Sequence, residues 1–170
     1  RLSQRLGIAY YDQEIIAEIS KRTELSEQYV RKMAEKNPIF SFPLHIGRSF
    51  HYMQNSPWDL NLSIFREQSS IIREMAQKSD CVIVGRCADY ALAEYPNVLS
   101  VFISGNMDEK IKYISKLYDK TPEKAKDIIV KTDKKRSNYY NYYTSKKWGD
   151  ARSYDVCLNS SVLGPEGTVD

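Results

Sequence analysis

The sequence lacks the features that mark membrane, secreted and disulfide-rich proteins. Among its 170 residues no apolar run reaches the roughly 18 residues that a membrane span requires, so we expect no membrane partner. Residues 1–7 carry no apolar core of a secretory signal. Cysteine is scarce, and Cys81, Cys87 and Cys157 show no metal-ligand spacing. These absences predict a reduced, cytoplasmic chain whose cysteines are small buried hydrophobes.

Several catalytic signatures are also missing. The chain has two histidines, His45 and His51, and neither has acidic or cysteine neighbours at ligand spacing, so we predict no metal site and no histidine catalysis. No Ser-His-Asp pattern, nucleophile elbow or deaminase motif occurs. The phosphate-binding pattern Gly-x-x-x-x-Gly-Lys-Ser/Thr is absent as well.

What is present is the composition of a folded domain with an uneven charge. Hydrophobic residues make up 42% and charged residues 28%, which predicts one globular domain over residues 1–170. The formal net charge is +3, yet the stretch from Lys110 to Arg152 holds thirteen Lys/Arg and only five Asp/Glu. Such a basic block attracts phosphates, although a solvated helix face is an equally open interpretation.

Short apolar runs alternate with amphipathic segments along the chain. The apolar runs read as strands at residues 8–11, 81–84, 98–103 and 154–158. Helix-start signals occur at Asp12, Ser26, Ser56, Asn106 and Thr121, and a further one at Gly164. Buried strands alternating with helices predict an α/β fold in which a parallel sheet is flanked by helices.

Polar residues gather where these strands end. In parallel α/β sheets ligands bind outside the carboxyl ends of the strands. The residues at the ends of the four predicted strands are Asp12, Gly85–Arg86, Ser104–Gly105 and Asn159–Ser160. The sequence therefore predicts a binding site at this edge of the sheet.

Arg86 is the sharpest candidate of this group. A guanidinium at a strand end can hold a phosphate through two parallel hydrogen bonds, and Gly85 lets a ligand approach closely. The alternative is a structural ion pair with Asp89 or Asp12. Asp12 itself reads either as a helix N-cap or as a carboxylate that holds a base or an arginine.

Residues 131–148 interleave cations with tyrosines. This pattern is open to three interpretations: a surface for single-stranded nucleic acid, a mobile arm that closes cations over a triphosphate, or a helix whose tyrosines pack on the core. Helical spacing places Lys131, Lys135 and Asn138 on one face, and Tyr139, Tyr142 and Tyr143 on an adjoining face.

Taken together, these stretches resemble the cytidylate kinase-like branch of the nucleoside monophosphate kinases. The resemblance covers nearly the whole chain in order and spacing. The matching segments are residues 7–12, 81–90, 132–143, 147–150 and 154–164.

The resemblance implies a P-loop kinase fold with a helical lid, which transfers the terminal phosphoryl of ATP to a nucleoside monophosphate such as CMP or dCMP with Mg²⁺. It implies that Arg86 holds the acceptor phosphate, and that Asp12 and nearby Asp89 contact the acceptor. Lys135 and Arg136 would neutralise charge on the transferring phosphoryl, which makes them, with Arg86, the expected catalytic residues. It also implies an acceptor-binding helical region at about 26–79 and a lid at about 121–150, with small-molecule nucleotides as partners.

The chain departs from the family pattern in three places. Residues 84–87 read Val-Gly-Arg-Cys instead of Asp-Gly-Arg-Asp, the lid has lysines and tyrosines in place of several arginines, and the P-loop pattern is absent. Asn159 also takes the place of an aspartate at the end of the last strand. Because the family's P-loop lies upstream of the helix that residues 1–6 end, we expect this chain to begin inside that helix and to stop early in its last helix. The alternative function is a non-catalytic module that keeps the fold and binds nucleotides or nucleic acid.

Overall fold

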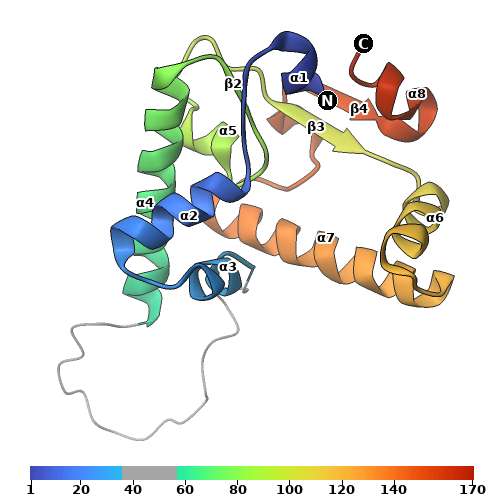
Figure 1. The fold of residues 1–170 in the computed structure, drawn as a ribbon, viewed down its shortest axis with the longest axis horizontal. Helices are drawn as coiled ribbons and strands as arrows, with labels where there is room; N and C mark the ends of the chain where they lie inside the picture. The colour runs from blue at the N-terminus through green and yellow to red at the C-terminus, as the bar shows by residue number, and fades with distance from the viewer. Residues whose placement is uncertain (36–56) are drawn as a thin grey trace, which may run out of the picture. The chain divides into compact units, whose positions relative to one another are not determined.

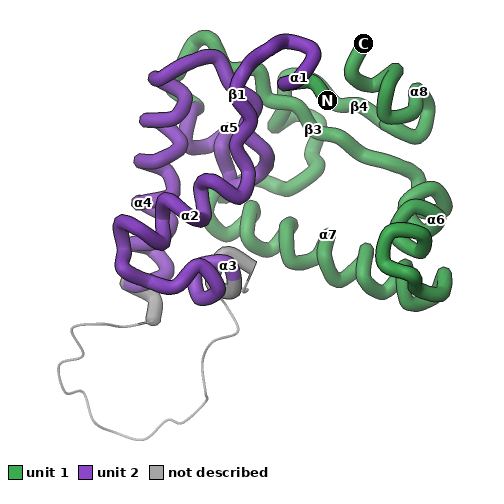
Figure 2. The backbone as a smooth tube through the Cα atoms, viewed as in Figure 1, with its two compact units in different colours: residues 1–2, 93–170 green, residues 3–92 purple. Residues whose placement is uncertain are grey.

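The structure, a computed structural model, describes the backbone of residues 1–35 and 57–170. His45 and His51 lie outside the described residues. The described chain packs into two compact units, Ser3–Leu92 and Ala93–Asp170 with Arg1–Leu2 (Figure 2). This division into units does not test the predicted single domain, and the acceptor-binding and lid regions also stay predictions.

The unit Ser3–Leu92 is built from helices around one pair of strands (Figure 1). Its elements are α1 (Leu2–Leu6, whose first residue belongs to the other unit), β1 (Ala9–Tyr11), α2 (Gln13–Thr23), α3 (Glu27–Glu35), α4 (Pro57–Lys78), β2 (Cys81–Ile83) and α5 (Ala88–Ala91). The helix starts predicted at Asp12 and Ser26 are confirmed, since α2 and α3 begin one residue later, whereas the start predicted at Ser56 lies outside the described residues. Helix α2 packs against α3 and α4, and α4 packs against α5.

Isoleucines form the core of this unit. Those of α2 recur at the three- and four-residue spacing that places them on one helix face, and they meet the apolar face of α4. The fully buried ones are Ile15, Ile16, Ile19, Ile71 and Ile72. Burying each such side chain contributes about 1.5–3 kcal/mol, so this face fixes how α2 and α4 pack.

The unit Ala93–Asp170 contains the second pair of strands and a helical hairpin. Its elements are β3 (Val101–Ser104), α6 (Met107–Tyr118), α7 (Pro122–Thr144), a 3-10 turn η2 (Ala151–Ser153), β4 (Val156–Asn159) and α8 (Ser160–Gly167). Helix α7 begins as predicted, because the Thr121 hydroxyl accepts a hydrogen bond from the Lys124 amide and Pro122 occupies the first turn. Helix α8 begins at Ser160, earlier than expected, and Gly164 interrupts it with a φ of 69°.

Aromatic rings contribute much of the packing in this second unit, beside the buried Ala125 and Ile129 of α7. The Phe102 ring makes an edge contact with Trp148 at 5.3 Å and a tilted contact with Tyr154 at 5.0 Å between centroids. Tyr140 of α7 stacks on Tyr154 and is buried. A Cβ on Gly149 would approach Phe102 to 3.2 Å at a φ of 77°, so glycine is required at this turn.

The strands are parallel as predicted, but they form two separate two-stranded sheets instead of one sheet. β1 pairs with β2, from Ala9 opposite Cys81 to Tyr11 opposite Ile83. β3 pairs with β4, from Val101 opposite Val156 to Ser104 opposite Asn159. Within residues 1–35 and 57–170 no further strand joins the two pairs.

The second pair starts later than the apolar runs predicted. Ser100 lies outside β3 because its amide and hydroxyl both donate to the Asp155 carboxylate, at 2.8 and 2.6 Å, instead of joining the strand ladder. β4 then alternates its side chains between two faces and leaves Cys157 exposed, so the prediction that all three cysteines are buried is wrong for this residue. In the part of the chain that the structure describes, no helix is long and apolar enough to cross a membrane.

Candidate functional site

The first predicted pair of strand ends does meet at one sheet edge. Asp12 follows the last residue of β1, and the Val84 amide donates a 3.0 Å hydrogen bond to the Tyr11 carbonyl. The chain therefore leaves β2 beside the end of β1, which brings Asp12 and Arg86 to the same edge. Asp12 occupies the N-cap position of α2, but its side chain does not cap the helix, and the Glu14 carboxylate accepts from the Asp12 amide instead.

Arg86 lies in a strained turn. Gly85, Arg86 and Cys87 all have left-handed backbone angles, with φ of 67°, 57° and 53°. For residues with a Cβ this conformation costs about 1–3 kcal/mol each and persists only where the surroundings enforce it. One such contact is the hydrogen bond from the Gln68 side-chain amide to the Arg86 carbonyl, at 2.9 Å.

The side chain of Arg86 is half-buried and forms no ion pair within the described part of the chain. The alternative interpretation, a structural ion pair with Asp89 or Asp12, therefore does not hold in this structure. Asp89 lies in the first turn of α5. Burial raises the pKa of the neighbouring Cys87 thiol to about 12, with Asp89 adding to the rise and Arg86 opposing it.

A pocket of about 310 Å³ opens between α4 and α5, the helix that follows this turn in the chain. Five of its lining residues lie on α4 at spacings of three or four positions, so they share one helix face. The lining residues are Leu62, Phe65, Arg66, Ser69, Arg73 and Tyr90, and we call this site the arginine pocket. Its two rings, Phe65 and Tyr90, lie 6.2 Å apart between centroids.

The two arginines of the pocket keep their charge available. Arg73 donates one hydrogen bond to the Ala91 carbonyl, and neither Arg66 nor Arg73 forms an ion pair within the described residues. Two guanidiniums that form no ion pair with a described residue, beside two aromatic rings, make an environment for a planar, anionic ligand. The strand ends on which the sequence prediction rested did not include either arginine.

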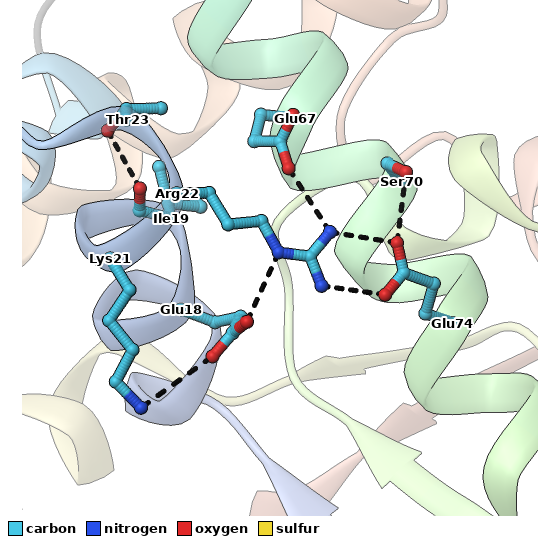
Figure 3. A network of polar contacts seen from close by, with 8 residues as sticks. All are labelled: Glu18, Ile19, Lys21, Arg22, Thr23, Glu67, Ser70 and Glu74. Carbon is cyan, nitrogen blue, oxygen red and sulfur yellow. Dashed lines mark hydrogen bonds and ion pairs between the residues drawn. The ribbon is translucent and has the colours of Figure 1, made fainter.

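Glu67 and Glu74, which follow these arginines in the sequence, pair with Arg22 of α2 (Figure 3). Arg22 of α2 reaches Glu67 at 3.2 Å, Glu74 at 2.6 Å and Glu18 at 3.1 Å. These contacts hold the pKa of the Glu74 carboxyl down at about 2, mainly through its hydrogen bond from Arg22. Helix α4 thus turns its glutamates toward α2 and its arginines toward the pocket.

The second predicted pair of strand ends also meets, in the unit Ala93–Asp170. The Ser160 hydroxyl donates to the Ser104 carbonyl at 2.9 Å, and the Asn159 side-chain nitrogen donates to the Asn106 side-chain oxygen at 3.1 Å. The Ser161 hydroxyl accepts from the Asn106 backbone amide at 2.8 Å. The four predicted strand ends therefore come together as two pairs, one in each unit.

The basic, tyrosine-rich segment is helical from residue 131 to Thr144, where α7 ends, and it packs within its own unit. Lys135 and Arg136 are exposed in the middle of α7, and Arg136 lies 3.6 Å from Asp133, which also pairs with Lys110 of α6 at 3.0 Å. The tyrosines adjoin as predicted, with Tyr139 and Tyr143 rings 4.7 Å apart. The packed-helix interpretation is confirmed for Tyr140, which is buried, but Tyr142 is exposed. Closure of the segment over a phosphate and binding of single-stranded nucleic acid stay predictions.

The described residues do not fit a protein-held metal site. No three His, Cys, Asp or Glu side chains within them lie close enough together to hold a metal ion. We therefore assign no residue of this chain to Mg²⁺.

Sequence reasoning missed Gln68, Arg66 and Arg73. The two arginines carried a signal, because the pair Arg-Glu occurs at 66–67 and again at 73–74, seven residues apart and hence on the same helix faces. Gln68 carried only a weak one, a polar residue on the apolar face of a helix.

A family model and a curated relative both connect the chain with cytidylate kinases. The chain matches the cytidylate kinase-like family over residues 1–162. It is 25% identical over 100 residues to a cytidylate kinase of Halobacterium salinarum (strain ATCC 29341 / DSM 671 / R1), a match that covers 58% of this chain and 52%, about half, of that relative. A crystal structure of an uncharacterized protein from Eubacterium ventriosum ATCC 27560 matches with a TM-score of 0.70 and 28% identity, over 99% of this chain and 83% of that one. The chain belongs to the cytidylate kinase-like family.

Proposed function

We propose that this protein transfers a phosphoryl group from ATP to a nucleoside monophosphate, with CMP or dCMP as the acceptor. The observation that carries the proposal is the Arg86 turn, where a strained backbone presents a guanidinium that forms no ion pair within the described residues. Family membership and the cytidylate kinase among its relatives support kinase chemistry.

Phosphoryl transfer of this kind needs positioning and charge neutralisation and no covalent intermediate. Arg86 would hold the acceptor phosphate through two hydrogen bonds, since a guanidinium fork matches two phosphate oxygens. Asp12 would orient the acceptor from the adjacent strand end, and Asp89 would contribute a second carboxylate from α5. These roles follow the family resemblance and the shared sheet edge.

The arginine pocket would take part in acceptor binding. Its volume of about 310 Å³ lies at the lower end of the usual range for small-molecule sites, about 300–1,000 Å³. Phe65 and Tyr90 offer rings for contact with a planar base, and Arg66 and Arg73 offer positive charge. A nucleoside monophosphate combines the two properties that this lining favours.

Lys135 and Arg136 would neutralise charge on the transferring phosphoryl. Both are exposed cations of α7, in the unit Ala93–Asp170. Because lysine lacks the planar fork of arginine, Lys135 would act as a point charge and Arg136 as the bidentate donor.

The test is acceptor-dependent ADP formation by the protein with ATP, MgCl₂ and each of CMP, dCMP, UMP and AMP. We expect turnover with a cytidine acceptor and a loss of roughly 30- to 150-fold in kcat/KM in Arg86→Ala, because a charged hydrogen-bond pair at such a site contributes about 2–3 kcal/mol. Arg152→Ala is the matched control, since Arg152 is 88% exposed and pairs only with Asp150 among the described residues. Unchanged turnover in Arg86→Ala would refute the assignment.

The second candidate is a non-catalytic binding module, and the exposed cations of α7 are the observation in its favour. This candidate predicts no ADP formation with any acceptor. It predicts instead binding of single-stranded nucleic acid whose affinity falls steeply with salt.

A further inference from the structure

Gln68 is a polar side chain in an apolar place. It lies on the buried face of α4 with a side chain 1% exposed, between isoleucines that are buried to the same degree. Burying a primary amide is unfavourable unless its donors and acceptors find partners. The Gln68 side-chain nitrogen donates a 2.9 Å hydrogen bond to the Arg86 carbonyl, eighteen residues along the chain. A carbonyl accepts and never donates, so this contact itself fixes which end of the amide faces the turn.

The hydrogen bond from Gln68 ends at a turn with three consecutive left-handed residues. Gly85, Arg86 and Cys87 are consecutive left-handed residues, and Gln68 holds the carbonyl of the middle one. A hydrogen bond to that carbonyl fixes the plane of the peptide that joins Arg86 to Cys87. Since the direction of the Arg86 side chain depends on its own backbone angles, a fixed peptide also fixes where the guanidinium can reach.

We propose that Gln68 is a positioning residue, which holds the Arg86 turn in its left-handed conformation and thereby aims the Arg86 guanidinium at the acceptor phosphate. The second half of this statement rests on the proposed function of Arg86. The first half concerns the turn alone and stands on the hydrogen bond and the backbone angles.

A purely structural role makes a different demand on this position. The core needs only volume there, and methionine would fill it with similar size and no polar atom to satisfy. A core role predicts that substitution lowers stability and leaves acceptor affinity unchanged while the protein stays folded. A positioning role predicts lower affinity through Arg86 in particular.

The experiment compares Gln68→Met with Ile71→Ala by calorimetric titration of the full chain with CMP. Ile71 lies one helix turn away on the same buried face, and its truncation lowers stability without touching the Arg86 carbonyl. We expect CMP binding to weaken about tenfold in Gln68→Met, the scale of one hydrogen bond that fixes a charged group, and to stay at the wild-type value in Ile71→Ala. Equal CMP affinity in Gln68→Met and wild type would overturn the aiming role.

The same titration in the Arg86→Ala background completes a double-mutant cycle. If Gln68 acts through Arg86, Gln68→Met causes no further loss of CMP affinity in that background. The same tenfold loss in both backgrounds would overturn the proposal, because it would show an effect that bypasses Arg86. If Arg86→Ala itself leaves CMP affinity unchanged, the proposed function of Arg86 fails. Whether Gln68 holds the turn is then tested by a separate measurement.

That readout is the rate at which a thiol reagent modifies Cys87, measured without nucleotide in a Cys81→Ala, Cys157→Ala background. Cys87 is only 4% exposed and directly follows Arg86, so its modification reports opening of the turn. We expect Gln68→Met to raise the rate at least fivefold over Ile71→Ala. Equal rates in the two variants would show that Gln68 does not hold the turn.

Discussion

The two units of the chain bury different kinds of side chain. In Ser3–Leu92, isoleucines from α2 and α4 are fully buried against each other. In Ala93–Asp170, aromatic contacts around Phe102 hold the packing, while Leu99 and Ile103 stay 68% and 60% exposed. Aliphatic packing buries more of each side chain, so we expect the first unit to tolerate core truncation least.

The proposed functional residues of the two units also differ in how the fold supports them. Arg86 belongs to a strained turn whose carbonyl is held by a buried donor, whereas Lys135 and Arg136 lie exposed on a regular helix. A strained, internally supported group is coupled to the fold, and an exposed cation is not. Function and stability should therefore separate cleanly in α7 and stay linked at the Arg86 turn.

The largest expected effect comes from replacing Lys134, Lys135 and Arg136 together with alanine. We expect loss of measurable phosphoryl transfer with a change in the free energy of unfolding below about 1 kcal/mol, because exposed charges contribute little to stability. Coupled assays of ADP formation and urea denaturation measure the two quantities. Intact transfer with a reduced salt slope of single-strand binding would favour the nucleic-acid module instead.

A substitution in each unit tests the difference between the two cores through the free energy of unfolding. Ile16→Ala should lower the free energy of unfolding by about 2–5 kcal/mol, since it leaves a cavity in a fully buried site. Ile103→Ala, at a position 60% exposed, should change it by about 0.5 kcal/mol or less. Denaturant unfolding of both variants checks this difference, and equal losses would contradict the account of the two cores.

The smallest expected effect is a pH dependence of the unit Ser3–Leu92. The pKa of Glu74 lies near 2 in the folded protein and at 4.5 without its partners. The ionised carboxylate therefore stabilises the fold above pH 4.5, and that contribution is lost as the pH falls from about 4.5 to about 2. Unfolding measured across this window should show a shallower slope in Arg22→Ala, and an identical slope would rule out the contact.

Much of the fold was predictable because it depends on local patterns. The spacing of Ile15, Ile16 and Ile19 predicted α2, and Thr121-Pro122 predicted the start of α7. The start of β3 was not predictable, because it depends on the Asp155 carboxylate, which lies far along the chain from Ser100. The failure of Asp12 to cap α2 has a local cause instead, because the Glu14 carboxylate, two residues away, accepts a hydrogen bond from the Asp12 backbone amide.

The candidate site also has features that the sequence predicted and features that it did not. The parallel-sheet rule predicted that Asp12 and Arg86 share an edge, and the pairing of β1 with β2 confirms it. The left-handed angles of Arg86 and Cys87 carry no sequence signal, because arginine and cysteine rarely adopt them. The contact of Gln68 with Arg86 depends on how α4 packs, which composition and spacing do not determine.

The central claim, that Arg86 holds the acceptor phosphate, is tested most directly by titrating the wild type and Arg86→Ala with CMP and with cytidine. The two ligands differ only in the phosphate, so the ratio of their dissociation constants isolates its contribution. The account predicts a preference for CMP of roughly 30- to 150-fold in the wild type, from a contact of about 2–3 kcal/mol, and little preference in Arg86→Ala. An undiminished preference for CMP in Arg86→Ala would contradict it.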